Sequence, residues 1–141
     1  MKREILFRGK CSNGRWIYGS LVVSKNIKAA IYYEEGKGLV KRLDWCYITP
    51  DTIGQYTGLR DKNGVKIFEG DFVCFSYIAD GINPIEIECL AKVIFEDGSF
   101  MIKCVKGHVH NSMQRALFAM DYFNIKVEVV GNITDNPELM K

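Results

Sequence analysis

A period of two in residue polarity runs through the twelve residues from Ile85 to Glu96. Its apolar or small members are Ile85, Ile87, Cys89, Ala91, Val93 and Phe95, and its charged members are Glu86, Glu88, Lys92 and Glu96. Successive side chains of a strand point to opposite faces, so this pattern indicates a strand with one apolar face. Asp97-Gly98 follows, a pair that favours a tight hairpin turn, and "FMIKCV" then returns. The segment therefore predicts an antiparallel hairpin.

The rest of the chain reads mostly as further strands. Short apolar or alternating segments separated by turn residues are "REILFRGK", "RWIYGSLVV", "IKAAIYY", "GLVKRLDW", "FVCFSY" and "IKVEVVGNI". One helix is expected near 112–123, where Met113, Leu117 and Met120 share a helical face and no Gly or Pro intervenes. Pro137 predicts a short C-terminal helical turn. We expect a mainly β (α+β) protein with a single domain over 1–141.

The composition is that of a soluble globular protein, with 48% hydrophobic and 26% charged residues in 141. No apolar run reaches the ~18 residues of a membrane-spanning helix, and the N-terminus does not read as a signal peptide. We therefore expect a cytoplasmic protein without a membrane partner. The five cysteines are odd in number, widely spaced and free of C-x-x-C pairs, so we expect reduced core thiols.

The charge is uneven along the chain, although its net value is only +2. Residues 1–43 contain ten Lys and Arg against three Glu. Basic side chains interleaved with aromatic ones can neutralise phosphates and stack on bases, which predicts a nucleic-acid surface as one alternative. Its candidate residues are Arg8, Lys10, Arg15, Trp16, Lys28, Lys41 and Arg42. The competing interpretations are that the aromatic residues form the core and that folding mixes the two signs of charge.

The stretch "TGLRDKNGVKIFEGDFV" is rich in turn residues and carboxylates. Asn63-Gly64 reverses the chain, Asp61 can accept hydrogen bonds from nearby backbone N–H groups, and Gly70 is expected to have positive φ. Its structural motif comprises Gly58, Asp61, Gly64, Glu69, Gly70 and Asp71. A Gly-Asp pair before an apolar strand is common in small barrels, so we expect an antiparallel small-barrel, SH3-like element beginning here. Three carboxylates could instead serve Mg²⁺ or acid–base chemistry, but the motif contains no partner His.

Other signs of chemistry are sparse. Cys104, His108 and His110 form a C-x3-H-x-H run, which offers zinc three ligands where a structural site wants four. The alternative, which we favour, is that these residues belong to a polar loop before the helix. The glycines make no phosphate-binding loop, and no cysteine lies in a setting that would lower its pKa. We therefore expect no catalytic, cofactor-binding or metal residues, and no enzymatic activity.

Three segments resemble one known family. "YTGLRDKNGVKIFEGDFV" is similar to the hallmark of the YopX family, "REILFRGK" resembles its N-terminal signature, and "VVGNITDNPELM" its C-terminal one. Phe68 stands where the family commonly has Tyr, which keeps an aromatic anchor. The resemblance implies a small protein encoded by a phage or prophage, acting in a bacterial host cell. It implies no biochemical activity.

These observations together predict a non-enzymatic accessory protein. We expect it to act through contacts with copies of itself or with a phage or host protein, because unpaired strand edges and complementary charges both favour association. Nucleic-acid binding through the basic, aromatic-rich N-terminal part is the alternative. No cofactor is expected.

Overall fold

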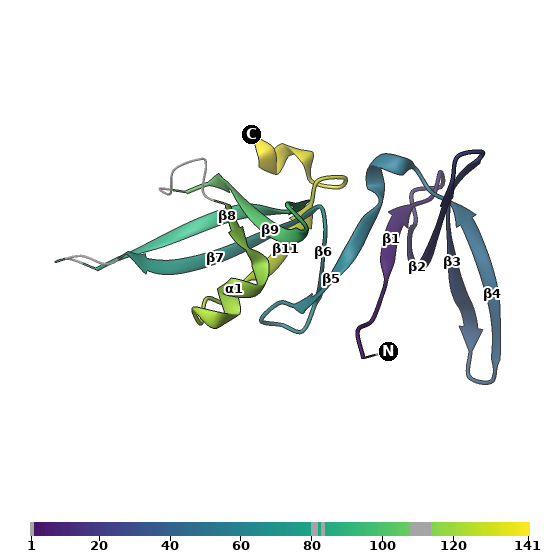
Figure 1. Cartoon of the computed structure of the whole chain (residues 1–141), viewed down its shortest axis with the longest axis horizontal. Coiled ribbons are helices and arrows are strands. Elements are labelled where there is room, and N and C mark those ends of the chain that lie inside the picture. Colours follow the sequence, from purple (N-terminus) through teal and green to yellow (C-terminus); the bar gives the residue numbers. More distant parts are fainter. Residues whose placement is uncertain (1, 80–81, 83, 108–113) are drawn as a thin grey trace. The chain divides into compact units, whose positions relative to one another are not determined.

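The structure, a computed structural model, describes residues 2–79, 82, 84–107 and 114–141. The chain forms two compact units, which we call unit 1, Met1–Gly58, and unit 2, Leu59–Lys141. Both are built mainly from antiparallel strands (Figure 1), which confirms the mainly β prediction. The expectation of a single domain over 1–141 stays a prediction, because two compact units can still fold as one cooperative domain.

Unit 1 contains a sheet in which most strands pair with their neighbours in the sequence. The strands are β1 (Phe7–Lys10), β2 (Trp16–Ser24), β3 (Ile27–Lys37), β4 (Val40–Tyr47) and β5 (Gly54–Arg60), with a short 3-10 helix η1 (Pro50–Thr52) before β5. Their order is β4-β3-β2-β1-β5, so β4 lies at the edge of the sheet (Figure 1). Gly14 has φ 83° in the turn between β1 and β2, where a tight hairpin favours glycine.

One face of this sheet carries the core of unit 1. Buried Ile17, Ile31 and Ile48 pack there with Cys11, and half-buried Phe7, Leu21, Tyr33, Cys46 and Ile53 pack around them. Cys11 and Cys46 are joined by a disulfide across this core. The expectation of five reduced thiols is therefore wrong for this pair. The register places Cys46 opposite buried Ile31, and the turn after β1 brings Cys11 into the same cluster, which the spacing of 35 residues did not reveal.

Unit 2 holds a five-stranded antiparallel sheet in the order β10-β9-β8-β7-β11. Its strands are β7 (Asp71–Ala79), β8 (Ile85–Glu96), β9 (Ser99–Lys106), β10 (Gln114–Ala116) and β11 (Glu128–Asn132), and β6 (Lys66–Phe68) precedes them. The predicted hairpin is confirmed, with Glu96 opposite Ser99 and positive φ at Asp97 and Gly98. The C-terminal helical turn is confirmed as a 3-10 helix, η2 (Pro137–Met140).

The apolar face of β8 builds the core of unit 2. Ala91 and Val93 are buried there with Val73 and Ile102 from the neighbouring strands, while both ends of the face, Ile85 and Phe95, are exposed. Helix α1 (Leu117–Tyr122) packs on this face through Leu117 and Met120, the helical pair that the sequence predicts. Met113 lies outside the described residues.

The predicted helix near 112–123 is wrong in its start. Residues 112 and 113 lie outside the described residues, and Gln114–Ala116 form strand β10, which pairs with β9 from Lys103 to Met101. The backbone groups at the edge of β9 take these residues into the sheet, so the helix begins only at Leu117. The SH3-like element is not confirmed, because the strand pairings of the described residues do not close a barrel.

Candidate interaction surface

Asp61 organises the turn at the centre of the hallmark motif. Its carboxylate Oδ1 accepts hydrogen bonds from the N–H groups of Asn63 at 2.8 Å and Val65 at 2.9 Å. Its Oδ2 accepts a third from Val129 of β11 at 3.0 Å. Burial raises the pKa of this carboxyl, but the three N–H donors and Lys62 outweigh it, so the pKa lies below its ordinary value. The carboxylate thus ties a local turn to a strand 68 residues away.

Gly70 and Asp71 form the second half of the motif. Gly70 has φ 89°, which confirms the predicted positive φ and favours glycine at this position. Its N–H donates to the Val93 carbonyl and its carbonyl accepts from Ile133 N–H, both at 2.9 Å. Asp71, 1% exposed, accepts a hydrogen bond from Phe68 N–H at 2.8 Å. The contacts at Asp61, Gly70 and Asp71 join segments of unit 2.

The remaining motif residues are Gly58 in strand β5, and Gly64 and Glu69 in turns. Gly58 and Gly64 have φ of 86° and 80° in open surroundings, and Glu69 is half-buried. Because Asp61 is occupied by backbone donors, it is a poor choice for a metal or a proton-transfer role. Within the described ranges, no three His, Cys, Asp or Glu side chains are gathered so as to hold a metal ion. His108 and His110 of the C-x3-H-x-H run lie outside those ranges, so the zinc site remains untested.

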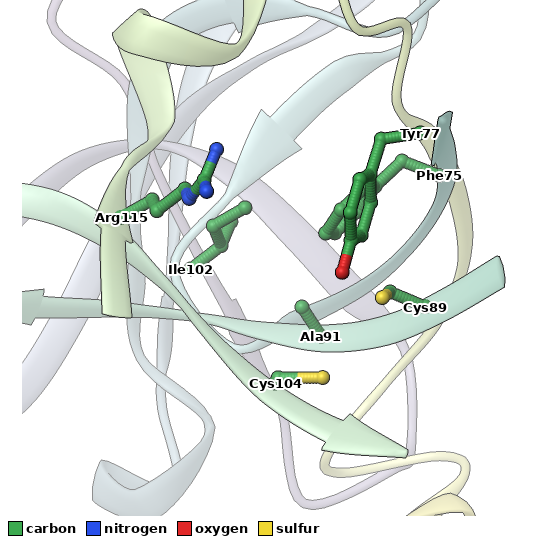
Figure 2. A pocket seen from close by; sticks show the side chains of 7 residues that line it. All are labelled: Phe75, Tyr77, Cys89, Ala91, Ile102, Cys104 and Arg115. Atoms are coloured by element: carbon green, nitrogen blue, oxygen red, sulfur yellow. The ribbon is translucent and has the colours of Figure 1, made fainter. Parts of the chain in front are cut away.

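A small apolar hollow lies on the helix-bearing face of unit 2. Figure 2 shows the side chains that line it: Phe75, Tyr77, Cys89, Ala91, Ile102, Cys104 and Arg115. Its volume of about 10 Å³ is room for roughly one water molecule. Burial raises the pKa of the Cys89 thiol to about 11, and Cys104, which shares a hydrogen bond with it, contributes to the rise. At neutral pH Cys89 is therefore a protonated thiol and a weak nucleophile.

The seven residues of the predicted nucleic-acid surface all lie in unit 1, but the sheet divides them between its two faces. By strand alternation, Arg8, Lys10, Trp16, Lys28 and Lys41 belong to the face opposite the core. Arg42 points to the core side, where it meets Glu35 at 3.3 Å and Asp44 at 3.7 Å. Arg15 also meets Glu35, at 3.9 Å, and donates to the Tyr33 hydroxyl. Arg15 and Arg42 are thus partly neutralised by neighbouring acids.

The other members of the set differ in exposure. Arg8 is only 7% exposed and lies over the Trp16 ring, with its Cζ 5.0 Å from the ring centre. Lys10 lies over the same ring at 5.7 Å. Lys41 meets Glu34 at 3.3 Å, and Lys28 is exposed. The structure therefore does not gather the seven residues into one continuous basic patch.

Aromatic side chains gather on the face of unit 1 that lies opposite its core. Tyr18, Trp45 and Tyr47 are about half exposed, and Tyr32 is half-buried among them. The ring centres of Trp45 and Tyr47 are 5.0 Å apart, and those of Tyr32 and Trp45 are 6.3 Å apart. We call these four residues, carried by β2, β3 and β4, the aromatic face. Contiguous exposed apolar patches are uncommon on soluble monomeric proteins, and where they occur they often mark interaction sites.

Sequence reasoning missed part of this surface. Tyr47 belongs to the aromatic face, and Leu43, which is 70% exposed, lies beside it on the same side of β4. The signal is present as an alternation of Leu43, Trp45 and Tyr47 in "LDWCY", but the strand expected from "GLVKRLDW" ends at Trp45. The sequence also offers no way to tell which face of the strand is buried.

The fold and these surfaces define a small protein of two β units with an exposed aromatic sheet face. The sequence model described as YopX protein matches residues 6–141, nearly the whole chain. The chain belongs to the YopX family, as the three resembling segments indicated.

A solved structure shares the fold. It is described as the crystal structure of protein EF1440 from Enterococcus faecalis, and its sequence is 22% identical to this chain. The match covers 99% of this chain and 100% of that one, with a TM-score of 0.60. A comparison with curated proteins finds no match. In the described part of the chain, no helix has the length and apolar character that crossing a membrane requires.

Proposed function

We propose that this YopX protein is a non-enzymatic accessory protein of a phage or prophage, which acts in the bacterial cytoplasm by assembling with copies of itself. The observation that carries the proposal is the aromatic face of unit 1 beside the open edge of β4. Burying an exposed aromatic cluster against a partner lowers the free energy of association, and aromatic side chains often contribute most of the binding energy at protein interfaces.

The distribution of charge also supports assembly. Unit 1 contains ten Lys and Arg against five Asp and Glu, whereas unit 2 contains nine against twelve. The excess of positive charge therefore belongs to one unit and the excess of negative charge to the other. Long-range attraction between unit 1 of one copy and unit 2 of another therefore speeds the encounter of copies at low salt.

Sedimentation velocity tests the proposal. We expect the particle mass to rise above the monomer mass of 16.1 kDa as the protein concentration increases through the micromolar range. Replacing Trp45 and Tyr47 with Lys should weaken association at least tenfold, because the partner would bury charges in place of rings. Phe118→Lys is the matched control, since Phe118 is an exposed aromatic residue of unit 2. A mass that stays at the monomer value up to about 1 mM, on the scale of weak interfaces, would refute self-assembly.

Nucleic-acid binding is the second candidate, and one observation favours it. Arg8 and Lys10 contact Trp16 on the same side of the sheet as the aromatic face, which is the combination that binds single strands by stacking and phosphate neutralisation. The test is binding of labelled single-stranded DNA, double-stranded DNA and RNA across a salt series. Binding that weakens steeply with salt and is lost in Trp45→Ala would favour this candidate. No binding at low salt would remove it.

A further inference from the structure

Strand β4 ends the sheet of unit 1 and presents an open edge. It pairs on one side with β3 through eight consecutive residue pairs, from Ala30 with Tyr47 to Lys37 with Val40, without a bulge. No strand of the described residues pairs with its other side. A long, regular edge of this kind is a template for another strand, and proteins usually protect such edges with bulges, prolines or charges. β4 has no bulge or proline, so its protection rests on its charges alone.

The residues on the two sides of Leu43 are complementary: cations precede it, and groups that attract cations follow it. One residue before Leu43 is Arg42 and one residue after it is Asp44. Two residues before it is Lys41 and two residues after it is Trp45. Each cation before Leu43 therefore has a counterpart at the same distance after it. The carboxylate of Asp44 matches Arg42, and the ring of Trp45 matches Lys41.

This symmetry matters when two copies of β4 lie antiparallel about a two-fold axis through Leu43. Arg42 of each copy then lies opposite Asp44 of the other, and Lys41 lies opposite Trp45. Directly opposed residues of antiparallel strands have Cβ atoms about 4.5–5.5 Å apart, within reach for ion pairs and cation–π contacts. Leu43, 70% exposed in the single chain, packs against its own copy.

Neighbouring registers are disfavoured by the same residues. A two-fold axis through Arg42 would place Arg42 opposite Arg42, and an axis through Asp44 would place Asp44 opposite Asp44. Like charges directly opposite one another destabilise a strand pair. In the register about Leu43, opposed residues are separated by an even number of positions, so they belong to the same face of the strand. The two-fold axis is then perpendicular to the sheet, and both aromatic faces lie on the same side of it.

We propose that two copies of the chain join β4 to β4 in antiparallel register about Leu43, with the Arg42–Asp44 pairs setting the register. This inference rests on the proposed self-assembly and names its partner, a second copy, and its contact. The two sheets of unit 1 become one continuous sheet across the dimer. Lys41 of each copy then covers Trp45 of the other, so the contact removes part of each aromatic face from water.

Charge reversal tests the register. Arg42→Asp gives a chain with an acid at both positions, and Asp44→Arg gives a chain with a cation at both. Each variant alone should be monomeric at concentrations where the wild-type chain is a dimer. An equimolar mixture should form a heterodimer, because both acids of the first variant then face both cations of the second. The double variant R42D/D44R should also dimerise, since the exchange restores both opposite-charge pairs.

The control is Arg15→Asp. Arg15 also meets Glu35, as Arg42 does, but it lies outside β4. This variant should keep the wild-type dimer, and circular dichroism melts of all variants show whether each is folded. The readout is mass by sedimentation velocity, with dimers at twice 16.1 kDa.

The outcomes separate this inference from the function on which it rests. A wild-type chain that is monomeric throughout overturns both. A wild-type dimer whose single variants remain dimeric, or whose mixed variants fail to associate, overturns the β4 contact and leaves self-assembly standing. Monomeric single variants that recover in the mixture establish the contact and its register.

Discussion

At the scale of single residues, the carboxylate of Asp61 joins two distant segments of unit 2. Two of its three hydrogen bonds close the turn and the third reaches β11. Asp61→Asn should lower the free energy of unfolding at neutral pH by about 1–3 kcal/mol, because an amide nitrogen replaces one acceptor oxygen and faces a buried N–H group. Urea unfolding of both proteins measures this difference.

The difference should depend on pH in a definite direction. The pKa of Asp61 is lower in the folded protein than in the unfolded chain, so the unfolded chain binds a proton first as the pH falls. The stabilisation is fully present above the unfolded pKa of about 4 and is lost as the pH falls through the folded value. Wild type and Asp61→Asn should therefore converge in stability toward about pH 2. A stability difference that stays constant from neutral to strongly acidic pH would contradict this assignment.

At the scale of elements, helix α1 depends on packing because it is only six residues long. Isolated helices of this length are not stable in water. Leu117 and Met120, each 2% exposed, anchor it on the sheet of unit 2. Leu117→Ala should lower the free energy of unfolding by about 2–5 kcal/mol through lost burial and the cavity it leaves. Phe118→Ala, at a neighbouring position that is 66% exposed, should cost much less, and denaturant melts compare the two. Equal losses would mean that α1 is held by something other than this face.

The elements also show what sequence reasoning reaches. The β8–β9 hairpin was predictable because period-two alternation and an Asp-Gly turn are both local signals. The start of α1 was not, because the competition between helix and strand at Gln114–Ala116 is decided by the open edge of β9, a tertiary contact that local pattern does not report. The Cys11–Cys46 disulfide depends in the same way on how β1 and β4 meet a common core. The aromatic residues of unit 1 other than Tyr47 were visible as a set in the sequence, but their exposure depends on which sheet face folding buries.

At the scale of the whole molecule, the Cys11–Cys46 disulfide belongs to unit 1 alone, and so do both tryptophans, Trp16 and Trp45. Tryptophan fluorescence therefore reports on unit 1. The disulfide spans 35 residues. For a loop of this size, loop-closure entropy predicts a stabilisation of up to ~4 kcal/mol. Replacing both cysteines with Ser should move the fluorescence-detected urea transition to lower concentration, and a reductant should do the same to wild type.

Unit 2 should respond differently to the loss of that disulfide. Its core residues on β7, β8 and β9 pack on one another and on α1, so hydrogen exchange along β8 and β9 should be unchanged in the double Ser variant. Cys74→Ser is the control, because Cys74 is a free, half-buried cysteine of unit 2 and should leave the fluorescence transition in place. Exchange along β8 and β9 that rises in parallel with the loss of unit 1 would show one cooperative folding unit over 1–141. Independent responses would make each unit a folding domain of its own.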